Sequence, residues 1–161
     1  MSLLKSIKAK LGDNFSKGDL FEDFVIDLFP EDVFQVIQIT PRREDLNGRW
    51  VEQSNFPDIR LRHEPSKHQF WVECKFRSST YQNKLQWCES YQLKRYKEIQ
   101  ESVRPEKIFI VAGLGGTCNR PDSLYCMPLD EIEYPGLFLN AIEKYRRNPQ
   151  TNFNYQAGRL F

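Results

Sequence analysis

The sequence FPDIRLRHEPSKHQFWVECKFRS, residues 56–78, alternates polar and apolar side chains on either side of a short turn. Alternation with a period of two is typical of β-strands, because successive side chains of a strand point to opposite faces. The stretch therefore predicts two strands, residues 56–63 and 68–77. Residues 64–67, EPSK, form the turn between them, with Pro65 at a turn position that favours proline.

The predicted hairpin places two carboxylates opposite each other. With the turn centred between Pro65 and Ser66, Asp58 faces Glu73 across the strand pair. Side chains in that relationship have Cβ atoms about 4.5–5.5 Å apart. Two like charges so close repel unless a cation lies between them, and carboxylate oxygens are ligands that suit Mg²⁺ and Mn²⁺. The hairpin therefore predicts a divalent-cation site.

Lys75 lies on the same predicted face as Glu73, two residues further along the strand. At about 7 Å from Glu73, it would help to orient an attacking water or neutralise charge in a transition state. The alternative is a surface hairpin whose carboxylates form ion pairs with Lys75, Arg60 and Arg77. The D…ExK pattern is short, and by itself it does not decide between the two.

Two predicted helices carry polar side chains next to apolar ones. Residues 18–29, GDLFEDFVIDLF, have helical spacing, and Glu22 falls at the border of the apolar arc. A carboxylate there needs a cation or a donor, unless its head reaches water. Residues 84–103 predict a second helix with one stripe at spacings of three and four: Leu85, Cys88, Gln92, Tyr96, Ile99 and Val103. The amide of Gln92 would be satisfied there by a site group, by DNA phosphate or by backbone.

The rest of the chain predicts a mixed α/β fold. Further strands are expected at residues 33–40, 107–113 and 123–128, a last helix at 135–147 and irregular structure at 148–161. The order α-β-β-β-α-β-β-α is typical of a mixed central sheet flanked by helices. We expect one domain, residues 1–161, with a core at about 18–128 and a C-terminal part at 129–161.

Composition narrows the possible functions. The net charge of +1 argues against a non-specific, highly basic coat protein for nucleic acid. The four cysteines include no CxxC pair, so we expect reduced, structural cysteines rather than a zinc ribbon. No stretch approaches the ~18 apolar residues of a membrane helix, and the N-terminal residues do not resemble a secretory signal. A cytoplasmic protein is therefore expected.

Together these features resemble the PD-(D/E)XK nuclease superfamily, which has a restriction endonuclease-like fold. The family includes restriction endonucleases, Holliday-junction resolvases and RecB-like nucleases. The order α-β-β-β-α-β at residues 18–128 is similar to the family core, and the matching motifs follow it in sequence. They are Glu22, Pro57-Asp58, Glu73-Cys74-Lys75, and QLKRY from Gln92 to Tyr96, which resembles the QxxxY motif of the RecB-like branch.

The resemblance implies a magnesium site in which Mn²⁺ can substitute. Asp58, Glu73 and the backbone carbonyl of Cys74 would hold the ion, and Glu22 would bind it through water or complete a second site. Lys75 would position or activate the attacking water. The reaction would be hydrolysis of a phosphodiester, leaving a 5′-phosphate and a 3′-hydroxyl.

The resemblance also implies supporting and DNA-binding residues. Gln92 would orient the site or contact DNA, and Tyr96 would support it. The loop at 41–55 and the basic residues of the second helix are the expected DNA contacts. The residues concerned are Arg42, Arg43, Arg60, Lys94 and Arg95.

The expected activity is that of a DNA endonuclease on structured or duplex DNA, and a homodimer or partners from a repair, restriction or mobile-element system would fit it. Exonuclease activity and RNA substrates stay open. The main alternative is a non-catalytic nucleic-acid-binding or assembly module that retains the fold. A nucleotide-binding protein using Gly113–Gly116 is disfavoured, because neither GxxxxGK[ST] nor GxGxxG is present. His63 and His68 are expected at the surface.

Overall fold

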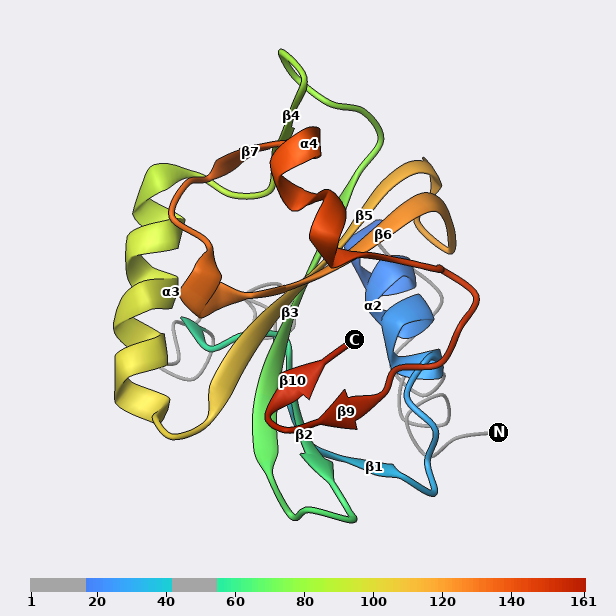
Figure 1. Ribbon diagram of the computed structural model, residues 1–161, viewed down its shortest axis with the longest axis vertical. Coiled ribbons are helices and arrows are strands. Elements are labelled where there is room, and N and C mark those ends of the chain that lie inside the picture. The colour runs from blue at the N-terminus through green and yellow to red at the C-terminus, as the bar shows by residue number, and fades with distance from the viewer. Residues whose placement is uncertain (1–16, 42–54) are drawn as a thin grey trace.

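The computed structural model describes residues 17–41 and 55–161, which form a mixed α/β structure (Figure 1). In this part of the chain a six-stranded mixed sheet has the order β1-β2-β3-β5-β6-β8. Its strands are β1 (Phe34–Ile39), β2 (Ile59–His63), β3 (Gln69–Arg77), β5 (Lys107–Thr117), β6 (Arg120–Pro128) and β8 (Arg146–Arg147). β3 and β5 run parallel, and the other neighbouring strands run antiparallel.

The hairpin of β2 and β3 has the predicted register. Ile59 pairs with Val72 and Leu61 pairs with Phe70, as a turn centred between residues 65 and 66 requires. The predicted turn is observed at residues 64–66. It is closed by a hydrogen bond from the Lys67 N–H to the His63 carbonyl. β3 is buried on both faces because it lies in the interior of the sheet.

Two helices cover opposite faces of the sheet (Figure 1). α2 (Lys17–Asp27) packs Phe21 and Val25 against the apolar side chains of one face, and α3 (Ser90–Val103) packs Leu93 and Tyr96 against the other. The alternation of β3 divides its side chains between these two cores. Phe70 and Val72 enter the α2 side, and Trp71 enters the α3 side.

The second predicted helix is shorter than expected. It begins at Ser90, and residues Lys84–Gln86 instead form β4, which pairs with β7 (Gly136–Phe138). Leu85 and Trp87 are both fully buried, and this spacing of two is the spacing of a strand. The apolar residues before Ser90 therefore belong to a different element from those after it.

The predicted helix at 135–147 is also mostly wrong. After β7, a single helical turn, α4 (Leu139–Ile142), is followed by a 3₁₀ turn (Glu143–Tyr145) and by β8. The pairing of β7 with β4 and of β8 with β6 draws both ends of this segment into extended structure. Such pairing over a long sequence separation outweighs local helical spacing.

The C-terminal stretch is more ordered than its composition indicates. β9 (Tyr155–Gln156) and β10 (Arg159–Leu160) form a small hairpin, and the Tyr155 ring stacks on Phe70 at 5.1 Å. His63 lies 5.0 Å from the same ring and is buried, which corrects its expected surface position, whereas His68 is exposed.

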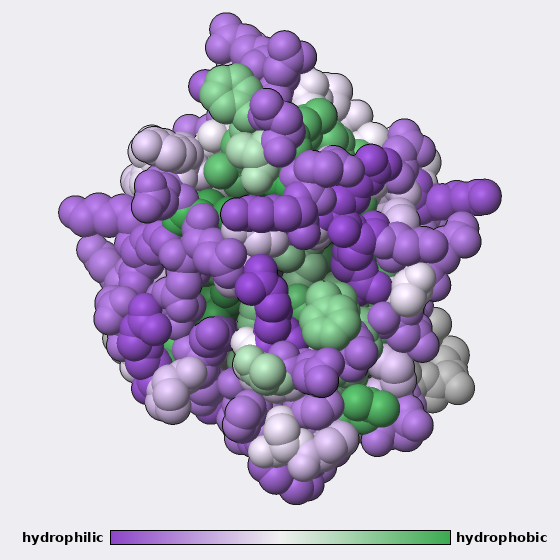
Figure 2. Space-filling model, viewed as in Figure 1, coloured by the Kyte–Doolittle hydropathy of each residue, from purple (hydrophilic) through white to green (hydrophobic). Residues whose placement is uncertain are grey.

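The face of the molecule seen in the view of Figure 1 is mostly hydrophilic, with small apolar patches between hydrophilic side chains (Figure 2). None of the helices in the described ranges is both long enough and apolar enough to span a bilayer. None of the four cysteines, which all lie in the described residues, forms a disulfide.

Candidate active site

Asp58 lies immediately before β2, and the end of β1 holds it there. The N–H of Thr40 donates to the Asp58 carbonyl at 2.9 Å, and the Thr40 hydroxyl donates to the carbonyl of Pro57. Thr40 is itself buried. Two bonds from one residue therefore fix the backbone that presents the Asp58 side chain.

Asp58 and Glu73 face each other through reciprocal hydrogen bonds. The Asp58 N–H donates to Glu73 Oε2 at 3.2 Å, and the Cys74 N–H donates to Asp58 Oδ2 at 2.9 Å. The backbone ladder of the hairpin ends one pair earlier, at Ile59 and Val72. Beyond that point carboxylate oxygens accept the bonds that carbonyls accept within a strand pair.

Glu73 is held from three elements and is only 5% exposed. Its Oε1 accepts a hydrogen bond of 2.6 Å from the Tyr96 hydroxyl on α3 and an ion pair of 3.0 Å from Lys75 Nζ on β3. The Tyr96 ring in turn stacks on Trp87 at 5.7 Å. The orientation of the Glu73 carboxylate is thus set by packed, mostly buried groups.

Electrostatics at Asp58 disfavour its ionised form. Burial raises the pKa of Asp58 well above its ordinary value, and the charges of Glu73 and Glu22 raise it further. The Cys74 N–H and the charge of Lys75 act in the opposite direction without cancelling these effects. Glu22 lies on α2 and is only 4% exposed, so of the two alternatives for this border position the structure shows the buried one. A cation at this point would relieve the repulsion.

Lys75 and Tyr96 both keep their protons at neutral pH. Burial lowers the pKa of Lys75, but its interactions with Glu73 and Asp58 outweigh burial and raise that pKa above its ordinary value. Burial and the neighbouring charge of Glu73 raise the pKa of Tyr96. Lys75 is therefore a fixed positive charge, and the hydroxyl of Tyr96 is a fixed donor.

Asp58, Glu73 and Lys75 line a cavity of about 450 Å³ between the first turn of α2 and the C-terminal end of β3. A cavity of this size can hold a ligand. Lys17 and Arg77 add positive charge to its wall. The lining residues are Lys17, Gly18, Asp58, Glu73, Cys74, Lys75, Phe76, Arg77 and Ser78; we call this the carboxylate cavity.

The carboxylate cavity offers a hard-oxygen donor set, as Mg²⁺ requires. Asp58 and Glu73 supply the side-chain oxygens, and Lys75 is paired with Glu73 without offsetting the burial and repulsion that raise the pKa of Asp58. In residues 17–41 and 55–161 there is no group of three or more His, Cys, Asp or Glu side chains arranged around one metal position. A fit to Mg²⁺ therefore rests on the Asp58–Glu73 pair, and backbone and solvent oxygens would have to supply the remaining ligands.

Gln92 makes a different contact from the one expected of a site residue. Its Oε1 accepts a hydrogen bond of 2.8 Å from the N–H of Glu89, which caps the N-terminus of α3. The fully buried amide of this helix is Gln100, which bonds to the Glu106 carbonyl and to the Ile108 N–H, each at 2.9 Å. The backbone alternative for Gln92 is thus observed, and its role toward the site stays a prediction.

The expected DNA-binding residues fall in different surroundings. Arg60 forms a two-point ion pair with Glu106 and lies over the Trp71 ring. The side chain of Lys94 is exposed. The Arg95 guanidinium lies 5.3 Å from the centroid of the Tyr96 ring. Arg42 and Arg43 lie outside the described residues.

Arg77 is a functional candidate that motif reasoning missed. Its guanidinium donates to the carbonyls of Gln86 and Trp87 at 2.7 and 2.9 Å, so it fastens the β4 segment to the end of β3 beside the carboxylate cavity. Strand alternation was the available signal, because Arg77 shares the face of Glu73 and Lys75.

Comparison with protein-family models and with curated proteins finds no match for this chain. Its function must therefore be inferred from the site itself.

Proposed function

We propose that this protein is a magnesium-dependent nuclease with a restriction endonuclease-like core, which hydrolyses phosphodiester bonds in DNA. The observation that carries the proposal is the convergence of Asp58, Glu73 and Lys75 at one cavity. The charge of Glu22 on Asp58 adds a third carboxylate to the same region. A buried acidic group with a perturbed pKa in a cavity, as Asp58 is, is typical of functional sites.

In this proposal Asp58, Glu73 and the Cys74 carbonyl would hold Mg²⁺. When bound, the ion would supply Lewis acidity to a phosphoryl oxygen. Glu73 stays correctly oriented because Tyr96 and Lys75 both bind its Oε1. Tyr96 thus acts through Glu73 as a positioning residue.

Lys75 would act as a cation. Its raised pKa keeps the ammonium charged, so it offsets the negative charge that develops on the phosphoryl oxygens as water attacks in line. The bond from phosphorus to the 3′ oxygen breaks, which leaves a 5′-phosphate and a 3′-hydroxyl. Lys17 and Arg77 line the same wall and would bind flanking phosphates.

The proposed substrate is structured or duplex DNA cut internally. The carboxylate cavity is open between α2 and the end of β3, so a backbone phosphate can enter it without a free chain end. Cutting both strands of such a substrate would require two sites, and a homodimer belongs to this proposal for that reason.

One observation favours the alternative of a non-catalytic DNA-binding module. Both oxygens of Glu73 already accept hydrogen bonds from within the chain, so this carboxylate is satisfied without an ion. A module of this kind would bind DNA equally well in chelator and would cut nothing.

Cleavage of a panel of labelled nucleic acids separates these two functions. The panel contains single-stranded, duplex, flap and four-way-junction DNA and one RNA, each with Mg²⁺, Mn²⁺ or EDTA. The proposal predicts metal-dependent cutting of at least one DNA by the wild type and its loss in Glu73→Gln. Tight DNA binding without cutting in any metal would instead support the binding module.

A further inference from the structure

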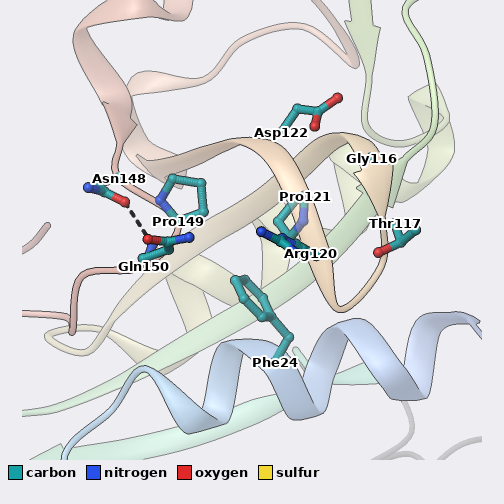
Figure 3. A pocket seen from close by; sticks show the side chains of 9 residues that line it. All are labelled: Phe24, Gly116, Thr117, Arg120, Pro121, Asp122, Asn148, Pro149 and Gln150. Atoms are coloured by element: carbon teal, nitrogen blue, oxygen red, sulfur yellow. Dashed lines mark hydrogen bonds between the residues drawn. The ribbon is translucent and has the colours of Figure 1, made fainter.

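A second cavity, of about 470 Å³, lies beside α2. Three segments form it: α2 supplies Phe24, the β5–β6 hairpin supplies one wall, and the chain after β8 supplies the other (Figure 3). Its lining residues are Phe24, Gly116, Thr117, Arg120, Pro121, Asp122, Asn148, Pro149 and Gln150. We call this the hairpin cavity, and no step of the proposed reaction uses it.

The hairpin cavity lies at the same end of the sheet as the carboxylate cavity. Arg77, which lines the carboxylate cavity, pairs with Leu114 on the neighbouring parallel strand, and Gly116 of the hairpin cavity follows two residues later. Helix α2 also touches both, through Gly18 and Phe24. Six helical residues span about 9 Å, so a ligand that fills one cavity ends close to the other.

An aromatic ring forms part of this cavity. Phe24 projects from α2 toward Arg120 and Pro121 (Figure 3). Its ring packs against Phe21 at 6.0 Å, and Phe21 in turn packs against Phe76 of the carboxylate cavity at 5.8 Å. Packing of this kind holds a ring in place, and nucleobases stack on such rings with little dependence on sequence.

The polar groups around the ring match a nucleobase better than a phosphate. The side chains of Arg120, Asp122, Asn148 and Gln150 are all exposed here. The Asp122 carboxylate repels an anion, but it accepts hydrogen bonds from the amino groups of bases, and amide and guanidinium groups bond to base edges. Charge therefore argues against a second phosphate site.

The turn glycines leave the space that Asp122 occupies. Gly115 and Gly116 have φ of +72° and +66°, a left-handed conformation that favours glycine. A Cβ at Gly115 would lie 2.8 Å from Asp122 Oδ2, and one at Gly116 would lie 2.5 Å from the Arg120 carbonyl oxygen and 3.0 Å from Asp122 Oδ1. The backbone is thus shaped around this carboxylate at the cavity wall.

We propose that the hairpin cavity binds one nucleobase of the substrate strand, stacked on Phe24, about one to three nucleotides from the phosphate in the carboxylate cavity. The spacing follows from the ~9 Å rise of α2 along its axis from Gly18 to Phe24 and from the ~3.4 Å rise per nucleotide along a strand. This inference rests on the proposed function for the identity of the strand. It makes the enzyme require an unstacked base next to the cut.

Binding measured without cleavage tests this inference directly. Fluorescence anisotropy in EDTA gives the affinity of the full chain for a 12-nucleotide single strand, and an abasic residue is then placed at each position in turn. Wild-type affinity should fall at one position by roughly 5- to 140-fold, the range that about 1–3 kcal/mol per stacked base corresponds to at about 1.4 kcal/mol per tenfold. Phe24→Leu, which keeps apolar volume but removes the flat ring, should bind the intact strand as weakly as wild type binds that abasic strand.

A matched control variant shows whether the loss of affinity comes from stacking at Phe24 or from the loss of any aromatic ring. Phe138→Leu makes the same change at an exposed ring on β7, outside both cavities, and should bind the intact strand as wild type does. Asp122→Ala should reduce discrimination among the four bases at the sensitive position. Circular dichroism of each variant confirms that it is folded.

The outcomes also distinguish this inference from the proposed function. An abasic profile that is flat in wild type, or identical in wild type and Phe24→Leu, overturns the base site even when Mg²⁺-dependent cleavage is present. A position-dependent profile abolished by Phe24→Leu supports the base site even when no substrate is cut. If Phe24→Leu weakens the binding of a free mononucleotide as much as it weakens the binding of the strand, the cavity is a site for a free nucleotide. That result would overturn its role in strand binding.

Discussion

The hydroxyl of Tyr96 on α3 donates a 2.6 Å hydrogen bond to Oε1 of Glu73 on β3. This bond ties the helix on one face of the sheet to the carboxylate that we propose as a magnesium ligand. Both groups are buried, so water does not readily take the place of the Tyr96 hydroxyl. Loss of this hydrogen bond therefore leaves Glu73 Oε1 with one donor fewer.

Tyr96→Phe should therefore lower the cleavage rate at saturating Mg²⁺ by about tenfold or more, the equivalent of ~1.4 kcal/mol. Tyr145→Phe is the matched control, because the Tyr145 hydroxyl donates to Glu131 at 2.9 Å away from the carboxylate cavity. Single-turnover cleavage of the two variants should differ, and equal rates would show that Tyr96 has no positioning role.

Asp58→Asn should stabilise the metal-free protein at neutral pH by roughly 0.5–2 kcal/mol. The pKa of Asp58 is raised in the folded state, so the folded protein binds this proton more tightly than the unfolded chain does. Stability from this group is present at low pH and is lost as pH rises through the folded pKa. Asparagine removes that loss and keeps an oxygen for the Cys74 N–H.

Thermal unfolding in EDTA from pH 4 to pH 8 measures this difference between wild type and Asp58→Asn. The gap should widen with rising pH, and Mg²⁺ should raise the melting temperature of wild type more than that of the variant. A gap that does not change with pH would mean that Asp58 is not strained by its neighbours.

Lys75→Arg should keep measurable cleavage activity, whereas Lys75→Met should lose about a hundredfold or more. The reason is that Lys75 acts as a charge, and its raised pKa prevents it from accepting a proton near neutrality. For the same reason the pH profile of the wild type should show no inflection from Lys75 below pH 10. Equal inactivity of both variants would argue for proton transfer by the amine.

Gln100→Ala should destabilise the protein by about 2 kcal/mol, because it leaves the Ile108 N–H and the Glu106 carbonyl without their buried partner. Gln92→Ala should cost less, about 0.5–1 kcal/mol, since it removes a cap at the helix end. Urea unfolding of both variants provides the comparison. The opposite order would mean that the Gln100 bonds do not tie α3 to β5.

The carboxylate hairpin could be predicted from sequence because its information is local. A turn at Pro65 and Ser66 and strict alternation on both sides fix the register, and the structure has that register. Helical spacing also placed Tyr96 on a buried face, but it placed Glu22 only at the border of one and left the burial of that side chain open. The pairing of β4 with β7 could not be predicted from the sequence, because about 50 residues separate the two strands and neither has a strong local pattern.

The partners of the buried amides could not be derived either. A stripe that began at Leu85 made Gln92 look buried, but the helix starts at Ser90 and its buried face runs through Leu93, Tyr96 and Gln100. A shift of one position along a helix turns a side chain by about 100°. Spacing alone therefore identified the correct helix but assigned its buried amide to the wrong glutamine.

We propose that the Asp58–Glu73 pair supports metal-dependent cleavage of DNA. The most direct test compares cleavage by Glu73→Gln and Glu98→Gln, the second being an exposed glutamate on α3, on one labelled DNA with Mg²⁺. We predict that Glu98→Gln cuts at the wild-type rate to 5′-phosphate products, and that Glu73→Gln loses at least a hundredfold. Equal cutting by both variants, or cutting that persists in EDTA, would mean that the Asp58–Glu73 pair does not support metal-dependent cleavage.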